Sequence, residues 1–284
     1  MPFQFLNLKA SCLFVLFLPF SFLFFTSPHT EISIGNSDFH NSDKISVRES
    51  NHELQIAVGD RIFVFGKAKG TLEKVKVGMH VLPFSQDVES GVNPNSFTSV
   101  SWKKLKDGSI QIRSSYNPWP SSLVWTVYEN GQLKMEAKST PEGLQNATWL
   151  GLGFNFPDKS LSQISWKSSG TGFGQWKNPD FLPMADPEVE LSDFQQGFFQ
   201  PIHTVKLEFE SITLDIATET PGVFLGLGKD QRIENSLPQL TSDLAFLFNQ
   251  PFLSPAKVTQ SPSVHSSGTP FLSIDPLVLW FHFQ

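Results

Sequence analysis

From about residue 45 to the end of the chain, short segments either alternate apolar and polar residues or are rich in β-branched and aromatic residues. Such segments predict β-strands, because successive side chains of a strand point to opposite faces of a sheet. No segment sustains the 3.6-residue apolar period of an amphipathic helix. Strands are expected within residues 44–49, 54–66, 71–82, 97–105, 108–116, 121–140, 148–156, 204–218, 222–228, 243–250 and 276–283.

Turn-forming residues separate these segments and indicate hairpins. Asp107-Gly108 and Asn130-Gly131 each lie between two expected strands, and both dipeptides are strong signals for a tight β-hairpin. The 20 prolines and 19 glycines fall mainly between strands. Closely spaced strands joined in this way predict antiparallel sheets packed face to face, so we expect an all-β fold in one large sandwich.

The N-terminal segment has a different pattern. Cys12–Phe25 is apolar apart from Pro19 and Ser21. It is shorter than the roughly 20 apolar residues of a membrane-spanning helix and matches the roughly 7–15 of an export signal.

These patterns divide the chain into three parts. We expect residues 1–27 to be a signal peptide, with an uncleaved N-terminal anchor as the alternative, followed by a polar linker over 28–44 and the β-domain over 45–284. The β-domain is then secreted or periplasmic. A membrane is a partner only if the N-terminal segment stays uncleaved.

Composition argues against several classes of site. A formal charge of -6 disfavours a nucleic-acid partner, which would need a basic face. The single cysteine, Cys12, precedes the β-domain, which therefore has no disulfide and no thiolate metal ligand. The seven histidines are too widely separated for the spacings that direct two imidazoles at one metal. We expect no metal and no cofactor.

One glycine-rich stretch, Ser165–Phe181, combines the side chains that bind sugars. An aromatic ring can stack on the apolar C–H face of a sugar while amides and charged groups bond its hydroxyls. We expect a strand followed by a loop here, without the helix N-terminus that a phosphate site would need. The candidate carbohydrate-binding residues in this loop are Phe173, Gln175, Trp176, Lys177 and Asn178.

Trp119 is a second candidate sugar platform, because prolines on both sides place it in a turn that we expect to be exposed. For both Trp119 and Trp176, core packing is the alternative interpretation. The other tryptophans lie on strand-like segments and are expected to fill the core; they are Trp102, Trp125, Trp149, Trp166 and Trp280.

Catalysis on a sugar would require two carboxyl groups facing each other about 5–9 Å apart. Acidic residues do gather between Asp180 and Asp193, but this proline-containing segment is typical of a solvated loop. We therefore expect no catalytic residue, and keep a carbohydrate-active enzyme as the alternative.

Three segments, in this order, resemble the C-terminal domain of family-2 glycoside hydrolases of the β-galactosidase type. They read VGDRIFVFGKAKGTLEKVKVGMHVL (58–82), WLGLGFNFP (149–157) and ISWKSSGTGFGQWKN (164–178). DLAFLFNQPF (243–252) and PLVLWFHF (276–283) are similar to its closing strands. The resemblance covers roughly Ile45 to Phe283 and implies a large antiparallel β-supersandwich similar to galactose mutarotases, with a concave carbohydrate-binding face.

The chain also departs from this family. It reads Gly170-Thr171-Gly172 where the family has Gly-Pro, and Pro179 follows Asn178 where the family has Arg. The family's acid and nucleophile belong to a catalytic barrel that these segments do not include.

The resemblance and the candidate loop together predict a secreted carbohydrate-binding domain that is not catalytic on its own. Its expected ligand is a galactoside or a plant-type oligosaccharide, and a separately encoded glycosidase is a further partner to test. The alternatives are a mutarotase-like epimerase or lyase on the same scaffold, and a structural subunit that docks onto a glycosidase.

Overall fold

β-Strands make up all the regular structure in the part of the chain that the computed structural model describes, and this part contains no helix that could span a lipid bilayer. All of it belongs to one unit, His40–Gln284. The predicted signal segment and most of the linker lie outside it. The described residues are 44–90, 96–117, 119–138, 150–157, 160–168, 173–177, 201–227, 242–247 and 276–284.

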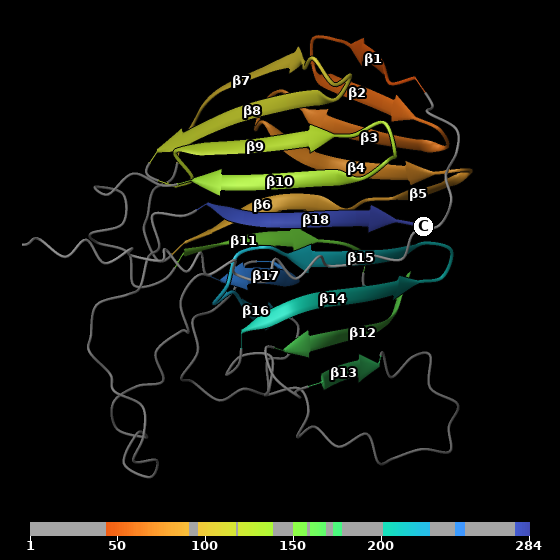
Figure 1. Cartoon of the computed structure of the whole chain (residues 1–284), viewed down its shortest axis with the longest axis vertical. Helices are drawn as coiled ribbons and strands as arrows, with labels where there is room; N and C mark the ends of the chain where they lie inside the picture. Colours follow the sequence, from red (N-terminus) through yellow and green to blue (C-terminus); the bar gives the residue numbers. More distant parts are fainter. Residues whose placement is uncertain are drawn as a thin grey trace, which may run out of the picture. The chain divides into compact units, whose positions relative to one another are not determined.

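Eighteen strands, all paired antiparallel, form three sheets (Figure 1). The five-stranded sheet has the order β1-β2-β3-β4-β5 and the four-stranded sheet has the order β16-β17-β11-β6. The strands of the first are β1 (Ser46–Glu49), β2 (Glu53–Val58), β3 (Arg61–Gly66), β4 (Thr71–Val77) and β5 (His80–Leu82). Those of the second are β6 (Ser85–Ser90), β11 (Leu150–Asn155), β16 (Phe224–Leu227) and β17 (Leu244–Leu247).

The third sheet has nine strands in the order β13-β12-β14-β15-β18-β10-β9-β8-β7. The C-terminal strand β18 lies at its centre, between β15 and β10. Its strands are β7 (Ser96–Lys104), β8 (Ile110–Asn117), β9 (Ser122–Val127), β10 (Leu133–Lys138), β12 (Leu161–Ser168), β13 (Phe173–Lys177), β14 (Ile202–Phe209), β15 (Thr213–Thr218) and β18 (Leu277–Phe283).

One face of the nine-stranded sheet packs against both smaller sheets. Phe65 of β3 contacts Trp125 of β9 with ring centroids 6.0 Å apart, and Phe154 of β11 contacts Phe281 of β18 at 5.3 Å. Phe84, between β5 and β6, stacks on Phe154 at 5.0 Å and is fully buried. Each buried ring of this kind contributes roughly 1.5–3 kcal/mol through removal of its surface from water.

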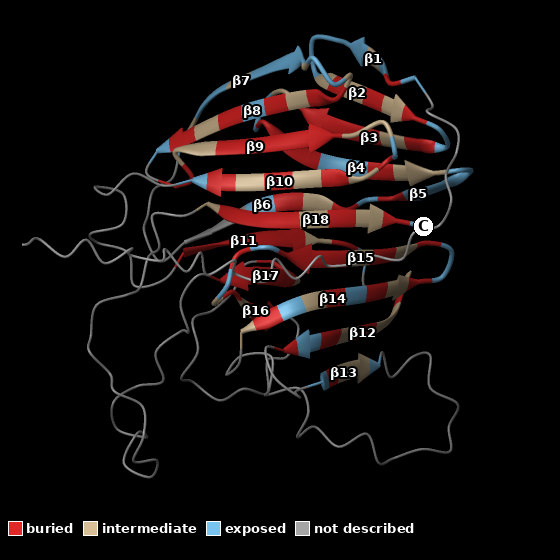
Figure 2. Ribbon diagram, viewed as in Figure 1, coloured by how far each residue is buried: buried red, intermediate tan, exposed pale blue. Residues whose placement is uncertain are grey.

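The expected alternation is present where one face of a strand meets this core. Along β8 and β10, buried residues alternate with half-buried or exposed ones, as Figure 2 shows. The two predicted hairpins are also confirmed. Gly108 and Gly131 have positive φ angles of 88° and 78°, a conformation that glycine adopts without strain.

The all-β fold and its antiparallel sheets are therefore confirmed. Two strands were not predicted, β6 and β13. The sheets have five, four and nine strands, and both smaller sheets contact the nine-stranded one.

Candidate functional site

The residues expected in a sugar-binding loop belong to an edge strand. Phe173–Lys177 is β13, which pairs antiparallel with β12 and places Trp176 opposite Ile164 and Gln175 opposite Ser165. The prediction of a loop at these residues is wrong. Glycine and polar residues weaken strand propensity, but hydrogen bonding to the edge of β12 overrides that local preference.

This strand conformation separates the candidate residues onto two faces. Directly opposed residues share a face, so Trp176 lies on the side of buried Ile164 and packs against the core. Gln175 points to the other face, as do Phe173 and Lys177, which are exposed. Trp176 therefore does not share a binding surface with these side chains, and Asn178 lies outside the described residues.

Trp119 is buried, so the prediction of an exposed turn is also wrong. Only 1% of its surface is accessible, and its indole N–H donates to the carbonyl of Gly151 at 2.9 Å. The ring fills space between the nine-stranded and four-stranded sheets, where its polar group has a partner. Trp119 is thus a core residue and offers no platform to a sugar.

The remaining tryptophans divide between core and surface. Trp125 and Trp166 are buried, as predicted. Trp102 is 39% exposed, so its assignment to the core is wrong. Trp280 is half-buried, and Trp149 lies outside the described residues.

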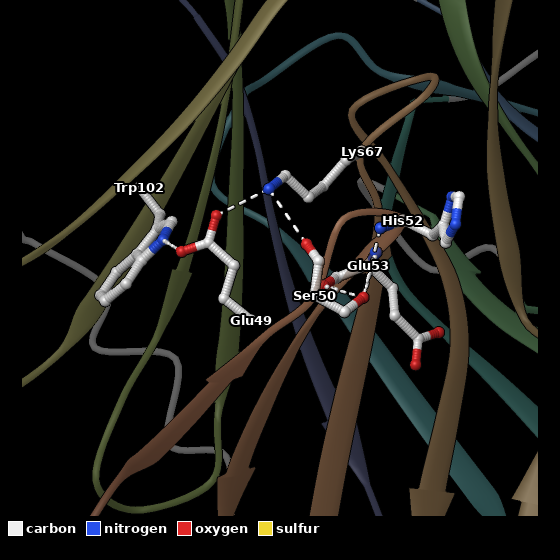
Figure 3. A network of polar contacts seen from close by, with 6 residues as sticks. All are labelled: Glu49, Ser50, His52, Glu53, Lys67 and Trp102. Carbon is white, nitrogen blue, oxygen red and sulfur yellow. Dashed lines mark hydrogen bonds and ion pairs between the residues drawn. The ribbon is translucent and has the colours of Figure 1, made fainter.

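Trp102 lies at a cavity between β7 and the five-stranded sheet. The cavity has a volume of about 140 Å³. Trp102 comes from β7, Glu49 from the end of β1, and Lys67 from the turn after β3 (Figure 3). We call this cavity, with Glu49, Lys67 and Trp102 around it, the Trp102 pocket. Its lining is completed by Leu54, Phe65, Gly66, Val100, Ser101 and Ile112.

The side chain of Glu49 connects the other two polar residues of the pocket. The Lys67 ammonium donates to Glu49 Oε1 at 2.7 Å, and the Trp102 indole N–H donates to Oε2 at 2.9 Å. Lys67 also donates to the carbonyl of Ser50 at 3.1 Å. Figure 3 shows Glu49 between the indole and the ammonium group.

The turn that carries this network is held by short local hydrogen bonds. The Ser50 hydroxyl accepts the backbone N–H groups of His52 at 3.2 Å and Glu53 at 3.0 Å. Such side-chain bonds to nearby backbone are what stabilise turns. The carbonyl of Ser50 is therefore fixed where Lys67 reaches it.

The hydrogen bonds also set the charge of the pocket. The bond from Lys67, and then the bond from Trp102, hold the pKa of Glu49 below its ordinary value of 4.5. Glu49 is consequently a carboxylate at neutral pH, and each of its oxygens keeps a further lone pair for a hydroxyl donor. Lys67 has a third N–H beyond the two already used.

Beneath these polar groups the pocket is apolar. Leu54, Phe65 and Ile112 contribute its floor and are 3%, 1% and 0% exposed. An apolar floor with a carboxylate, an ammonium and an indole at one side suits a ligand with an apolar face and several hydroxyl groups. Among the described residues, no group of three histidine, cysteine, aspartate or glutamate side chains could hold a metal ion.

A second polar arrangement lies on the nine-stranded sheet, on the face turned away from the core. Asp215 of β15 and His282 of β18 are directly opposed, and Lys206 of β14 lies opposite Asp215 on its other side. Burial raises the pKa of Asp215, and burial, followed by the charge of Arg61, lowers the pKa of His282. The Gln284 amide donates to Asp215 at 3.3 Å.

Sequence reasoning missed the Trp102 pocket because its residues are far apart in the chain. Trp102 and Glu49 are 53 positions apart, and Lys67 and Glu49 are 18 apart. One signal was available: β7 has serine, threonine or lysine at most positions, which is typical of an edge strand with two accessible faces. An aromatic residue on such a strand is a candidate for the surface.

The chain matches no protein-family model, and no curated protein is significantly similar to it in sequence.

Proposed function

We propose that the protein binds carbohydrate and that the Trp102 pocket holds one sugar ring. The observation that carries the proposal is the convergence of an exposed indole, a carboxylate and an ammonium group at one cavity with an apolar floor. Sugars require both kinds of surface, because their C–H faces are apolar and their edges are hydroxyl groups that donate and accept hydrogen bonds.

Each residue has a distinct part in the proposed complex. Glu49 accepts hydrogen bonds from two neighbouring hydroxyls, and Lys67 donates to a hydroxyl or ring oxygen. Trp102 holds the carboxylate in place and offers its ring to the sugar. The orientation of Glu49 by two donors before the sugar binds lowers the entropic cost of binding.

The finer predictions from the resemblance belong to the same proposal. We propose a β-supersandwich of the galactose mutarotase type, exported from the cytoplasm, that binds a galactoside or a plant-type oligosaccharide beside a separately encoded glycosidase. The three antiparallel sheets are consistent with that architecture.

Calorimetric titration with galactosides and plant-type oligosaccharides tests the proposal. Trp102→Ala and Glu49→Gln should each weaken binding at least about tenfold, a change worth about 1.4 kcal/mol. Met79→Ala is a matched control, because Met79 is an exposed apolar residue, 87% accessible, on the β4–β5 hairpin. Equal affinity of wild type and Trp102→Ala for every sugar that binds would reject the pocket.

An acid–base enzyme is the second candidate function, and the Asp215–His282 pair favours it. Two neighbouring groups with pKa values shifted in opposite directions are typical of sites that transfer protons. A polarimetric assay of anomer exchange tests this: acceleration by the wild type that is lost in Asp215→Asn would support an epimerase. No acceleration by the wild type would exclude that activity.

A further inference from the structure

One face of the nine-stranded sheet carries more positive than negative side chains. We call the face turned away from the two smaller sheets the open face; along its strands, exposed and half-buried residues alternate with buried ones (Figure 2). Its cationic side chains, assigned from strand register, are Lys103, Arg113, Lys134, Lys138, Lys167, Lys177 and Lys206. Its anionic side chains are Glu136, Glu208, Asp215 and Glu219.

The open face therefore carries seven cations and four anions, a net charge of +3. All the residues that the structure describes carry 16 lysine and arginine and 14 aspartate and glutamate side chains, a net charge of +2. The described residues outside this face carry nine cations and ten anions, a net charge of -1, so the positive charge of the described part is concentrated on the open face. A concentration of positive charge on one face of a protein attracts anionic ligands to that face.

Most of these cations are not neutralised within the described part of the chain. Lys206 pairs with Glu208 at 2.8 Å. Lys134 lies 3.3 Å from Glu136 and 3.8 Å from Glu219. The cations that make no ion pair with any described residue are Lys103, Arg113, Lys138, Lys167 and Lys177.

Three of the cations gather at the β13 end of the sheet. Lys167 of β12 and Lys206 of β14 are diagonal neighbours, and Lys177 lies at the sheet's edge on β13. A strand separation of about 4.8 Å and a rise of about 3.4 Å per residue place their Cα atoms roughly 8–14 Å apart. Because lysine side chains are long, their ammonium groups can lie closer together or farther apart than the Cα atoms and so fit the spacing of acidic groups on a ligand.

The surroundings of these lysines are suited to a sugar chain. One cross-strand row of the open face runs from exposed Phe173 through Lys167, Thr204 and Ala217 to half-buried Trp280. The next row carries Gln175 and Ser165. Rings, hydroxyls and amides thus accompany the positive charges, and these groups bind the neutral parts of a polysaccharide.

We infer that the open face binds an anionic polysaccharide, of the uronate or sulfated class, with Lys167, Lys177 and Lys206 contacting its acidic groups. Nucleic acid is a poorer fit, because duplex DNA carries one charge per about 1.7 Å and calls for a denser basic surface. A polysaccharide with one acidic group per sugar or per disaccharide has more widely spaced charges. The inference names a substrate class within the proposed carbohydrate binding and uses a surface separate from the Trp102 pocket.

Titrations with polygalacturonate, alginate and dextran sulfate, beside uncharged dextran of similar length, test this inference. The wild type should bind at least one polyanion about tenfold or more tightly than dextran, and its affinity should fall as salt increases. In Lys167→Gln/Lys177→Gln/Lys206→Gln the preference for the polyanion should disappear, and the salt dependence should weaken.

The matched control removes the same charge from another sheet. Lys44→Gln/Lys74→Gln/Lys76→Gln changes three lysines on or next to the five-stranded sheet. It should leave polyanion binding within about twofold of wild type, because screened charges elsewhere add little at physiological salt. Equal losses in the two triple variants would overturn the inference, as would wild-type binding to all three polyanions that is no tighter than its binding to dextran.

Two further measurements distinguish the open face from a lipid-binding surface and from the Trp102 pocket. Vesicles of phosphatidylserine and phosphatidylcholine test a lipid surface, and vesicle binding without polysaccharide binding would overturn the inference. Trp102→Ala should no longer bind neutral sugars but should still bind the polyanion. The open-face triple variant should still bind neutral sugars but should lose its preference for the polyanion. Loss of both ligands in Trp102→Ala, with a wild-type melting temperature, would place all binding in the pocket and reject the open face.

Discussion

Trp102 of β7 and Glu49 of β1 join the edges of two different sheets through one hydrogen bond of 2.9 Å. The same carboxylate accepts a hydrogen bond of 2.7 Å from the ammonium of Lys67. The indole and the ammonium therefore act on one acidic group from opposite sides, as Figure 3 shows. This relationship makes the charge state of Glu49 a measure of whether the pocket is assembled.

Trp102→Phe should raise the pKa of Glu49 toward its ordinary value while the fold stays intact. Phenylalanine keeps a ring in the pocket but has no N–H to donate, so one of the two bonds that lower this pKa is lost. Carboxyl resonances followed by NMR through an acid titration would measure the change. An unchanged Glu49 titration would mean that the indole does not contact the carboxylate in solution.

Replacement of Trp119 should be among the most destabilising single changes in the chain. The residue is 1% exposed, and Trp119→Ala leaves a large cavity, so we expect the free energy of unfolding to fall by about 3–5 kcal/mol. Trp119→Phe keeps most of the ring and removes the N–H that Gly151 accepts, and should cost about 1–3 kcal/mol. Urea unfolding measures both.

The two replacements also test the position of Trp119. An exposed tryptophan in a turn would tolerate alanine within about 0.5 kcal/mol. A loss of that size in the free energy of unfolding of Trp119→Ala would show that Trp119 lies at the surface. The exposed Phe173, at 52% accessibility, is the matched control, and Phe173→Ala should have little effect on stability.

Gly174 is the position in β13 where a side chain cannot be added. A Cβ at this residue would overlap the indole of Trp166 on the neighbouring strand. We expect Gly174→Ala to cost about 1–3 kcal/mol through overpacking. The double variant Gly174→Ala/Trp166→Leu should lose less than the sum of the two single changes, because each relieves the other.

A double-mutant cycle by thermal or urea unfolding provides the measurement. Strict additivity of the two changes would show that β13 does not lie against Trp166. It would also support the original interpretation of residues 173–177 as a loop.

The strands that could be predicted are those whose alternation is imposed by the core. In β8 and β10, every second residue is buried because one face meets the smaller sheets, and all of these residues except Ser114 are apolar, so the pattern alone predicts both strand and face. β13 could not be predicted from its composition. Its strand conformation comes from pairing with β12. This is a tertiary contact, and the glycine and glutamine of β13 do not themselves favour a strand.

The candidate site was harder to predict for a related reason. A tryptophan on a strand has the same sequence pattern whether the strand is central or at an edge, and only the sheet order places Trp102 at an edge and Trp125 in the middle. Trp119 gives the opposite case. Prolines nearby predicted an exposed turn, but a gap between two sheets and an available carbonyl made the buried position favourable.

His282 should make the stability of the protein decrease as the pH falls below neutral. Burial, followed by the positive charge of Arg61, lowers its pKa below the ordinary 6.5, while Asp215 acts in the other direction. Its ring Nδ1 is buried and has no hydrogen-bond partner among the described residues, which also disfavours the charged form. A lowered pKa means that the unfolded chain binds a proton more readily than the folded one.

This difference in proton binding determines how the free energy of unfolding changes with pH. Between pH 7 and the lower pKa of folded His282, acidification favours the unfolded state, so the free energy of unfolding should fall over that range. The raised pKa of Asp215 acts in the opposite direction, but at pH values nearer its ordinary 3.8. Urea titrations from pH 7.5 to 5 should give a slope for wild type that is smaller in His282→Gln, and retained in the exposed control His80→Gln. An identical slope in wild type and His282→Gln would show that His282 is not the group whose protonation opposes folding.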